Sequence, residues 1–311
     1  MASVGSILGG AFGLLRERPV SVVIWAVTYS VASLLLSFAM SLAMFGALMP
    51  DPQAMVQPGA AFGAAFGIVL LLYVALLFLA VVLMNAVFRS MLRPEDGGVA
   101  FMRIGMDELR MFGLVILVFI GAFVAILIGE LLLLLVVTVI GFALGQSVIT
   151  AVISFLLFLG FICAVIWAEV RISLIFPLSF YRRRISLDGA WSLTQGRFWM
   201  LFASYLVVTL IFAVAGGVLV WTMMGSYFAA MMQAGGDPAQ IQAAGQAFAA
   251  QQFAMPLTTK ILFWIVGSVF FAAAMALGPG LLASATRELL DIGGEDEAAV
   301  FAAESDGSIV D

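Results

Sequence analysis

Histidine is absent from this sequence, and cysteine and lysine occur once each, as Cys163 and Lys260. Because histidine is the commonest general base and the commonest metal ligand, its absence argues against most hydrolases, metalloenzymes and haem proteins. A single cysteine excludes an intramolecular disulfide. The sequence also lacks the motifs of an intramembrane protease and a phosphate-binding glycine loop. We therefore expect a protein that is not an enzyme and that carries no cofactor or metal.

Charged residues are scarce as well, at 10% of 311 residues, and no basic face with interleaved aromatic residues is found. This argues against nucleic acid as a partner. Apolar sequence dominates instead, since 64% of the residues are hydrophobic and the mean hydropathy is +1.20. Apolar runs of about 20 residues are typical of transmembrane helices. The composition therefore predicts an all-α polytopic membrane bundle.

Six apolar runs are long enough to cross a bilayer. The first is too long for the apolar core of a cleavable signal, so we interpret it as an uncleaved span. The loops between the runs pair them into three helical hairpins, and we expect an amphipathic interfacial helix before each hairpin. The spans are predicted at about 20–49, 59–89, 111–139, 148–180, 198–225 and 258–286.

Two segments illustrate the expected interfacial helices. Residues 3–16 carry apolar side chains at helical spacing and end in a basic stretch. Residues 99–110 place Arg103, Asp107 and Arg110 on one helical face, which predicts a ladder of charges facing water or lipid headgroups.

The three hairpins read as tandem pseudo-repeats within one membrane domain at 1–290, with units at about 1–97, 98–184 and 185–290. Arg18, Arg110 and Arg197 occupy corresponding places in the three units. Chance is the alternative, because hydropathy makes any array of hairpins look alike. Residues 291–311 form an acidic stretch with too little apolar sequence to fold alone, so we expect a disordered cytoplasmic tail. A solvated end and a docking segment for a basic cytoplasmic partner are both open.

Arginines mark one side of the predicted membrane domain, and Lys260 is the single basic residue on the other side. Cytoplasmic loops are enriched in Lys and Arg, so both termini are predicted to be cytoplasmic. The arginines on this side are Arg16, Arg18, Arg89, Arg93, Arg103, Arg110, Arg182, Arg183, Arg184, Arg197 and Arg287.

The stretch Ser192-Leu193-Thr194-Gln195-Gly196-Arg197-Phe198-Trp199 resembles the start of a membrane helix in bacterial six-helix inner-membrane proteins. These are the YciC-like proteins and the membrane domain attached to some glycerophosphoryl diester phosphodiesterases. The resemblance implies an integral protein of the bacterial inner membrane. The phosphodiesterase activity is not implied, because no such catalytic domain follows.

Glycines recur at every fourth position at the start of the second span, at Gly59, Gly63 and Gly67. Such a stripe allows two helix backbones to approach closely. Packing within the bundle and a homo-oligomer interface are both open.

Seven charged residues are candidates for a polar cluster at the inner end of the bundle: Arg89, Glu169, Arg171, Arg182, Arg183, Arg184 and Arg287. We expect Glu169 to meet Arg89, Arg287 or Asn85, and Arg171 to meet Glu288. A structural lock, a site for a lipid headgroup, anionic lipids included, and a transport gate are the three interpretations.

A further carboxylate, Glu130, lies within the third span, where an ionised group needs a partner or a proton. A proton or cation relay and a position at headgroup level are both open. For the whole chain we expect a non-catalytic membrane protein that organises lipids or partner membrane proteins. The alternative is a small transporter or flippase-like protein for an apolar or lipidic substrate.

Overall fold

The structure is a computed structural model that describes residues 3–48, 58–145 and 147–290, and all regular structure in these ranges is helical. The predicted tail at 291–311 and residues 49–57, between the first two spans, lie outside the described residues. The helices are α1 (Val4–Glu17), α2 (Pro19–Leu48), α3 (Pro58–Leu92), α4 (Met106–Leu144), α5 (Val148–Ile172), α6 (Ile175–Tyr181), α7 (Leu187–Leu193), α8 (Phe198–Gln233), α9 (Pro238–Ala254) and α10 (Leu257–Leu290), with 3₁₀ turns η2 (Pro94–Asp96) and η3 (Val99–Phe101).

Six helical stretches of this chain are long and apolar enough to cross a membrane, which confirms the prediction of an all-α polytopic membrane bundle. Several exceed the predicted lengths. For example, α4 has 39 residues and extends about 58 Å at 1.5 Å per residue, against a hydrocarbon core of about 30 Å. The stretches are Pro19–Met40, Phe66–Leu92, Val99–Leu144, Val148–Tyr181, Phe198–Gln233 and Leu257–Leu290.

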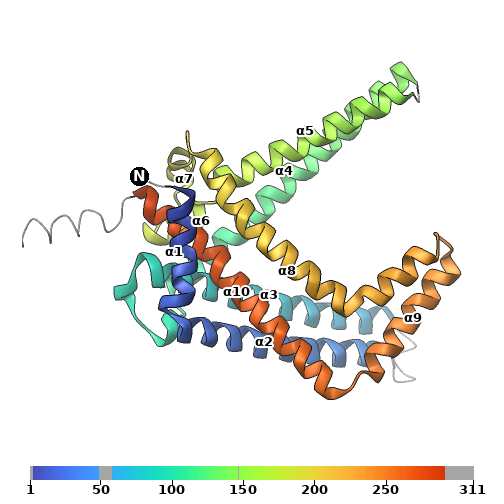
Figure 1. Cartoon of the computed structure of the whole chain (residues 1–311), viewed down its shortest axis with the longest axis horizontal. Helices are drawn as coiled ribbons and strands as arrows, with labels where there is room; N and C mark the ends of the chain where they lie inside the picture. Colours follow the sequence, from blue (N-terminus) through green and yellow to red (C-terminus); the bar gives the residue numbers. More distant parts are fainter. Residues whose placement is uncertain (1–2, 49–57, 146, 291–311) are drawn as a thin grey trace, which may run out of the picture.

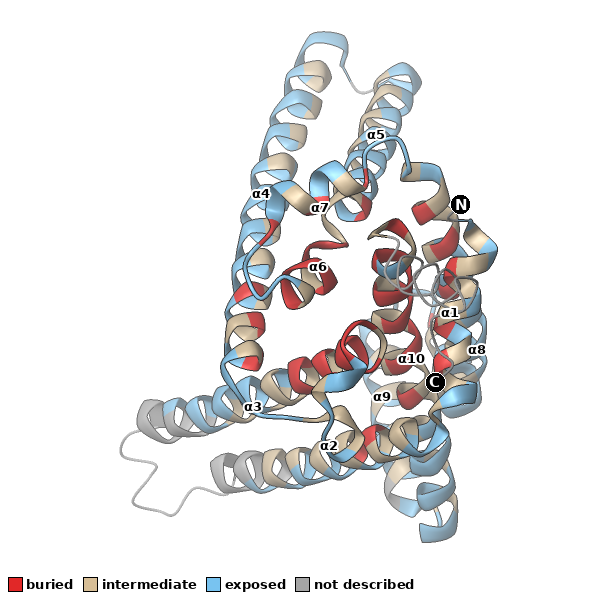
Figure 2. Ribbon diagram, turned by 90° about the vertical axis from the view of Figure 1, so that its left-hand side faces the viewer, coloured by how far each residue is buried: buried red, intermediate tan, exposed pale blue. Residues whose placement is uncertain are grey.

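Three hairpins diverge from a common base (Figure 1). They consist of α2 with α3, α4 with α5, and α8 with α9 and α10. Figure 2 shows that the buried residues gather where the hairpins meet, whereas the parts farther out are mostly exposed. Because many of the arginines lie here, we call this base the arginine end. Its core includes Phe88, Leu174, Leu178, Phe180, Leu201 and Leu281.

The predicted first interfacial helix is present as α1, but it packs along α10 instead of lying only on an interface. A capping box between Ser3 and Ser6 starts the helix. Ile7, Ala11 and Leu14 are buried. The two helices can approach closely because Gly10 has no side chain. A Cβ atom at this position would overlap Ser284.

The prediction of a second interfacial helix at 99–110 is wrong. Positive φ values at Ala100 and Phe101 turn the chain, and α4 begins only at Met106. Asp107 and Glu108 face inward to Arg93, which follows α3, and to Arg89 in α3, whereas the apolar Val99 is 76% exposed. The inward carboxylates neutralise buried arginines, which outweighs the amphipathic pattern of an isolated helix.

Of the glycine stripe, Gly63 and Gly67 are exposed and have nothing within 4 Å of the position of a Cβ atom. The interpretation as packing within the bundle is therefore wrong for these two residues. Side-chain surroundings at Gly59 lie outside the described part of the chain, and the homo-oligomer stays a prediction.

The Asp237 side chain caps the start of α9 by accepting a hydrogen bond from the Ala239 backbone N–H, and Pro238 is the first residue of the helix. This helix lies far from the arginine end (Figure 1). The segment between α8 and α10 is thus a helix that packs against α8, and it lengthens the third hairpin.

Candidate functional site

The seven predicted site residues do not form one cluster. Arg89 in α3 pairs with Glu108 in α4, and their side chains are only 3% and 2% exposed. The Arg89 guanidinium also donates to the carbonyl oxygen of Phe101. The expected contact between Arg89 and Glu169 does not form, because the Arg89 guanidinium binds the Glu108 carboxylate instead. Sequence reasoning missed Glu108, which adjoins the supposedly water-facing Asp107.

Further ion pairs extend from this contact and hold α3, α4 and the loop after α6 together. Arg93 lies 3.1 Å from Asp96 and 3.3 Å from Asp107, and Arg183 lies 3.3 Å from Asp96. Arg110 binds Asp107 and donates to the carbonyl oxygen of Arg183. We call Arg89, Arg93, Asp96, Asp107, Glu108, Arg110 and Arg183 the arginine cluster. Of the predicted residues it contains only Arg89 and Arg183.

The other predicted arginines lie elsewhere at the arginine end. Arg171 stacks on Trp167 and Trp191, with its guanidinium carbon 5.5 Å and 5.2 Å from the ring centroids. The expected pair of Arg171 with Glu288 is not among the ion pairs of the described residues. Arg182, Arg184 and Arg287 are exposed.

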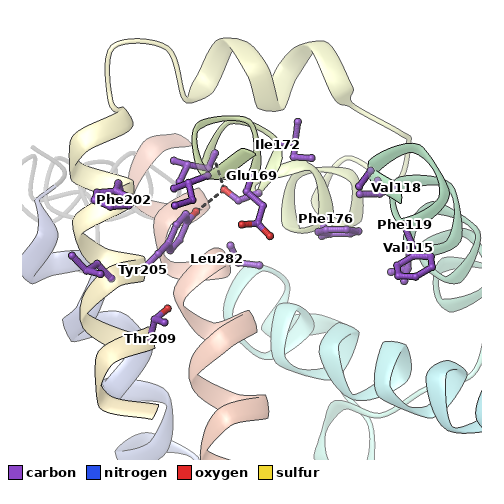
Figure 3. A pocket seen from close by; sticks show the side chains of 15 residues that line it. Val115, Val118, Phe119, Glu169, Ile172, Phe176, Phe202, Tyr205, Thr209 and Leu282 are labelled. Carbon is purple, nitrogen blue, oxygen red and sulfur yellow. Dashed lines mark hydrogen bonds between the residues drawn. The ribbon is translucent and has the colours of Figure 1, made fainter. Parts of the chain in front are cut away.

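Glu169 lines a pocket of about 680 Å³ between the second and third hairpins (Figure 3). Its walls come from α4, α5, α6, α8 and α10, and we call it the inter-hairpin pocket. The lining residues are Val115, Val118, Phe119, Ala122, Ile166, Glu169, Val170, Ile172, Ser173, Phe176, Phe202, Tyr205, Leu206, Thr209 and Leu282.

A break in the fourth predicted span shapes one wall of this pocket. The first helix ends at Ile172 and the next begins at Ile175, with Pro177 in its first turn. Proline has no backbone N–H, so it cannot donate to the carbonyl four residues earlier, and the helix is interrupted there. At the break, Ser173 Oγ donates to the Val170 carbonyl oxygen at 2.8 Å and lies 2.7 Å from Tyr205 Oη.

The polar groups of the pocket are few and lie among apolar side chains. Figure 3 shows the Glu169 carboxylate directed into the space between Tyr205 and Phe176. Thr209 lies one turn beyond Tyr205 on α8. The pocket therefore combines a large apolar surface with a carboxylate and three hydroxyl groups.

Glu130 does not join any of these groups. It lies exposed in the distal half of α4, next to Gly129, whose neighbour is Phe161 of α5. A relay role and a headgroup-level position both stay predictions. Among the described residues no group of three or more Cys, Asp or Glu side chains is placed to hold a metal ion.

No protein-family model, curated protein or solved structure matches this chain. The resemblance of residues 192–199 to bacterial six-helix inner-membrane proteins therefore stays an expectation. What the chain does has to be argued from its own geometry.

Proposed function

We propose that this integral membrane protein is non-catalytic and binds a membrane lipid in the inter-hairpin pocket. The observation that carries the proposal is the position of this apolar pocket. Its lining residues belong to membrane-spanning stretches of two different hairpins.

The size and lining of the pocket support a lipidic ligand. Ligand sites typically enclose about 300–1,000 Å³ and are lined mainly by apolar and aromatic side chains with a few polar groups. The inter-hairpin pocket, at about 680 Å³, has this character. Because its walls are spanning helices, a molecule dissolved in the bilayer reaches it without crossing water.

Residues near the pocket favour a location close to lipid headgroups. Trp191 and Trp199 are 44% and 76% exposed at the arginine end, which also carries the exposed Arg182 and Arg184. Tryptophan is enriched at membrane interfaces and arginine on the cytoplasmic side. We therefore propose that the arginine end and both termini face the cytoplasm, in the inner membrane of a bacterium. Anionic lipids are the expected neighbours of these exposed arginines.

A second candidate is a transporter or flippase-like protein that moves the same ligand. The α4–α5 hairpin contacts α3, α6, α7 and α8, and its outer part diverges from α8 (Figure 1). A change in this divergence would open or close the pocket. This function predicts lipid movement between the leaflets of reconstituted vesicles, whereas binding alone predicts none.

Filling the pocket tests the proposal. Leu206 and Val207 are adjacent on α8 and are 43% and 36% exposed, but only Leu206 lines the pocket. We expect Leu206→Trp to lose lipid that the purified protein retains through detergent washing, measured by native mass spectrometry. Val207→Trp is the matched control and should retain it. Equal lipid retention in both variants would contradict the proposed function.

A further inference from the structure

The hydroxyl groups of Ser173 and Tyr205 in the inter-hairpin pocket can offer a ligand only hydrogen-bond acceptors. Ser173 has one hydroxyl proton and donates it to the Val170 carbonyl oxygen. In the 2.7 Å contact with Tyr205, the proton must therefore come from Tyr205. Both hydroxyl protons are then used inside the protein. What Ser173 and Tyr205 still present to the pocket is lone pairs, so both are acceptors.

The Glu169 carboxylate adds acceptors and negative charge to the same space. An ionised carboxylate only accepts hydrogen bonds. It has no ion pair or hydrogen bond with another residue in the described ranges. None of the 15 lining residues is Lys or Arg. Because an unpaired carboxylate within a spanning segment is costly, a cationic ligand would stabilise it.

Aromatic rings complete the pattern. Phe119, Phe176, Phe202 and Tyr205 all line the pocket. The face of an aromatic ring carries partial negative charge and attracts ammonium groups within about 6 Å. The Thr209 hydroxyl can donate or accept, so it does not discriminate between ligands. The pocket thus favours a group that donates hydrogen bonds and carries positive charge.

We infer that the inter-hairpin pocket selects a bilayer lipid whose headgroup carries a primary ammonium group, with Glu169 as its counter-ion. The inference rests on the proposed function and adds the chemical class of the lipid. Anionic headgroups are disfavoured beside Glu169, because no basic side chain in the lining offsets the repulsion. The pocket therefore differs in specificity from the exposed arginines of the same end.

A matched pair of lipids tests the inference. Phosphatidylethanolamine and its N-acetylated form share phosphate and acyl chains, but only the first carries an ammonium group. In native mass spectrometry of the full chain, we expect retention of phosphatidylethanolamine to exceed that of the N-acetylated lipid by about tenfold, the effect of one charge-assisted contact. Equal retention, or a preference for phosphatidylglycerol, would overturn the inference.

Variants of two carboxylate residues test whether Glu169 is the source of the preference for the ammonium headgroup. Glu169→Gln keeps the shape of the side chain and should abolish the preference for the ammonium headgroup, and Glu169→Lys should turn it towards phosphatidylglycerol. Glu130→Gln removes a carboxylate from a spanning helix outside the pocket and should leave the preference unchanged. An unchanged preference in Glu169→Gln would overturn the inference, provided that size-exclusion chromatography shows a folded protein.

The Leu206→Trp variant distinguishes a failure of ammonium selection from a failure of lipid binding. If it loses lipid but the wild-type chain retains all three lipids equally, the pocket binds lipid without selecting ammonium, and only this inference fails. If Leu206→Trp retains lipid as the wild-type chain does, the proposed function fails and the inference fails with it.

Discussion

The arginine end and the distal parts of the hairpins are built on opposite principles. At the arginine end, buried side chains from most helices pack together, and the arginine cluster joins two hairpins. In the distal parts, large apolar side chains such as Phe142 and Val148 are 87% and 81% exposed. Lipid tails are as apolar as these side chains, so packing one hairpin on another gains little there. Polar contacts and close packing at one end therefore decide how the hairpins are joined.

Because of this contrast, we expect loss of the Arg89–Glu108 ion pair to lower the free energy of unfolding more than loss of any other contact considered below. Arg89→Met would leave the 2%-exposed Glu108 side chain without its cation, and breaking a buried pair in this way costs about 3–5 kcal/mol. We expect a loss of this size in the free energy of unfolding, measured by denaturant titration in detergent micelles. Glu130→Gln, in the distal half of the same helix as Glu108, should change it by less than about 0.5 kcal/mol.

The double variant Arg89→Met with Glu108→Leu sharpens the interpretation. Replacing both partners removes the unpaired charge, so much of the lost stability should return. If the double variant is no more stable than Arg89→Met alone, the cost does not come from an unpaired carboxylate, and the contrast between the two regions loses its main support.

Disturbing the contact between α1 and α10 should give the next largest loss of stability. Leucine at Gly10 would collide with Ser284, and overpacking costs about 1–3 kcal/mol. Gly9 is exposed, and nothing lies within 4 Å of the position of its Cβ atom, so Gly9→Leu is the matched control and should not destabilise. Thermal unfolding in detergent measures both. Equal losses in the two variants would mean that α1 does not dock on α10.

The smallest effect concerns the turn before α4. Trp25 is 2% exposed, and its Nε1–H donates to the Ala100 carbonyl oxygen at 2.7 Å. Trp25→Phe removes that donor and should cost about 1 kcal/mol. Trp264 is 40% exposed on α10, so Trp264→Phe should cost less than about 0.5 kcal/mol in the same titration. A larger loss in Trp264→Phe would contradict the division into a packed end and an exposed remainder.

Most of the architecture could be predicted from the sequence, because hydropathy and charge act locally. The six spans and their pairing into hairpins depend on residues close together in the chain. The prediction failed at 99–110, where the helical pattern of charges was interpreted as a water-facing surface. Arg89 in α3 and Arg93 directly after it lie opposite that segment and pair with its carboxylates.

The candidate site was only partly predictable for the same reason. Glu169 was identified because a carboxylate in an apolar span is conspicuous, but its surroundings were not. The walls of the inter-hairpin pocket come from residues as far apart in the sequence as Val115 and Leu282. The Ser173–Tyr205 hydrogen bond, which decides the donor and acceptor character of the site, joins two different hairpins.

The sequence by itself determined that this chain is a multi-pass helical membrane protein, because each apolar run must satisfy its own backbone hydrogen bonds in lipid. Only the tertiary structure decided which charges are neutralised within the protein and that the Glu169 carboxylate lies at a pocket without an ion pair among the described residues. Arg89 meets Glu108, whereas Glu169 faces an apolar pocket. That difference depends on how separate helices pack, and local sequence patterns do not encode the distance between side chains on different helices.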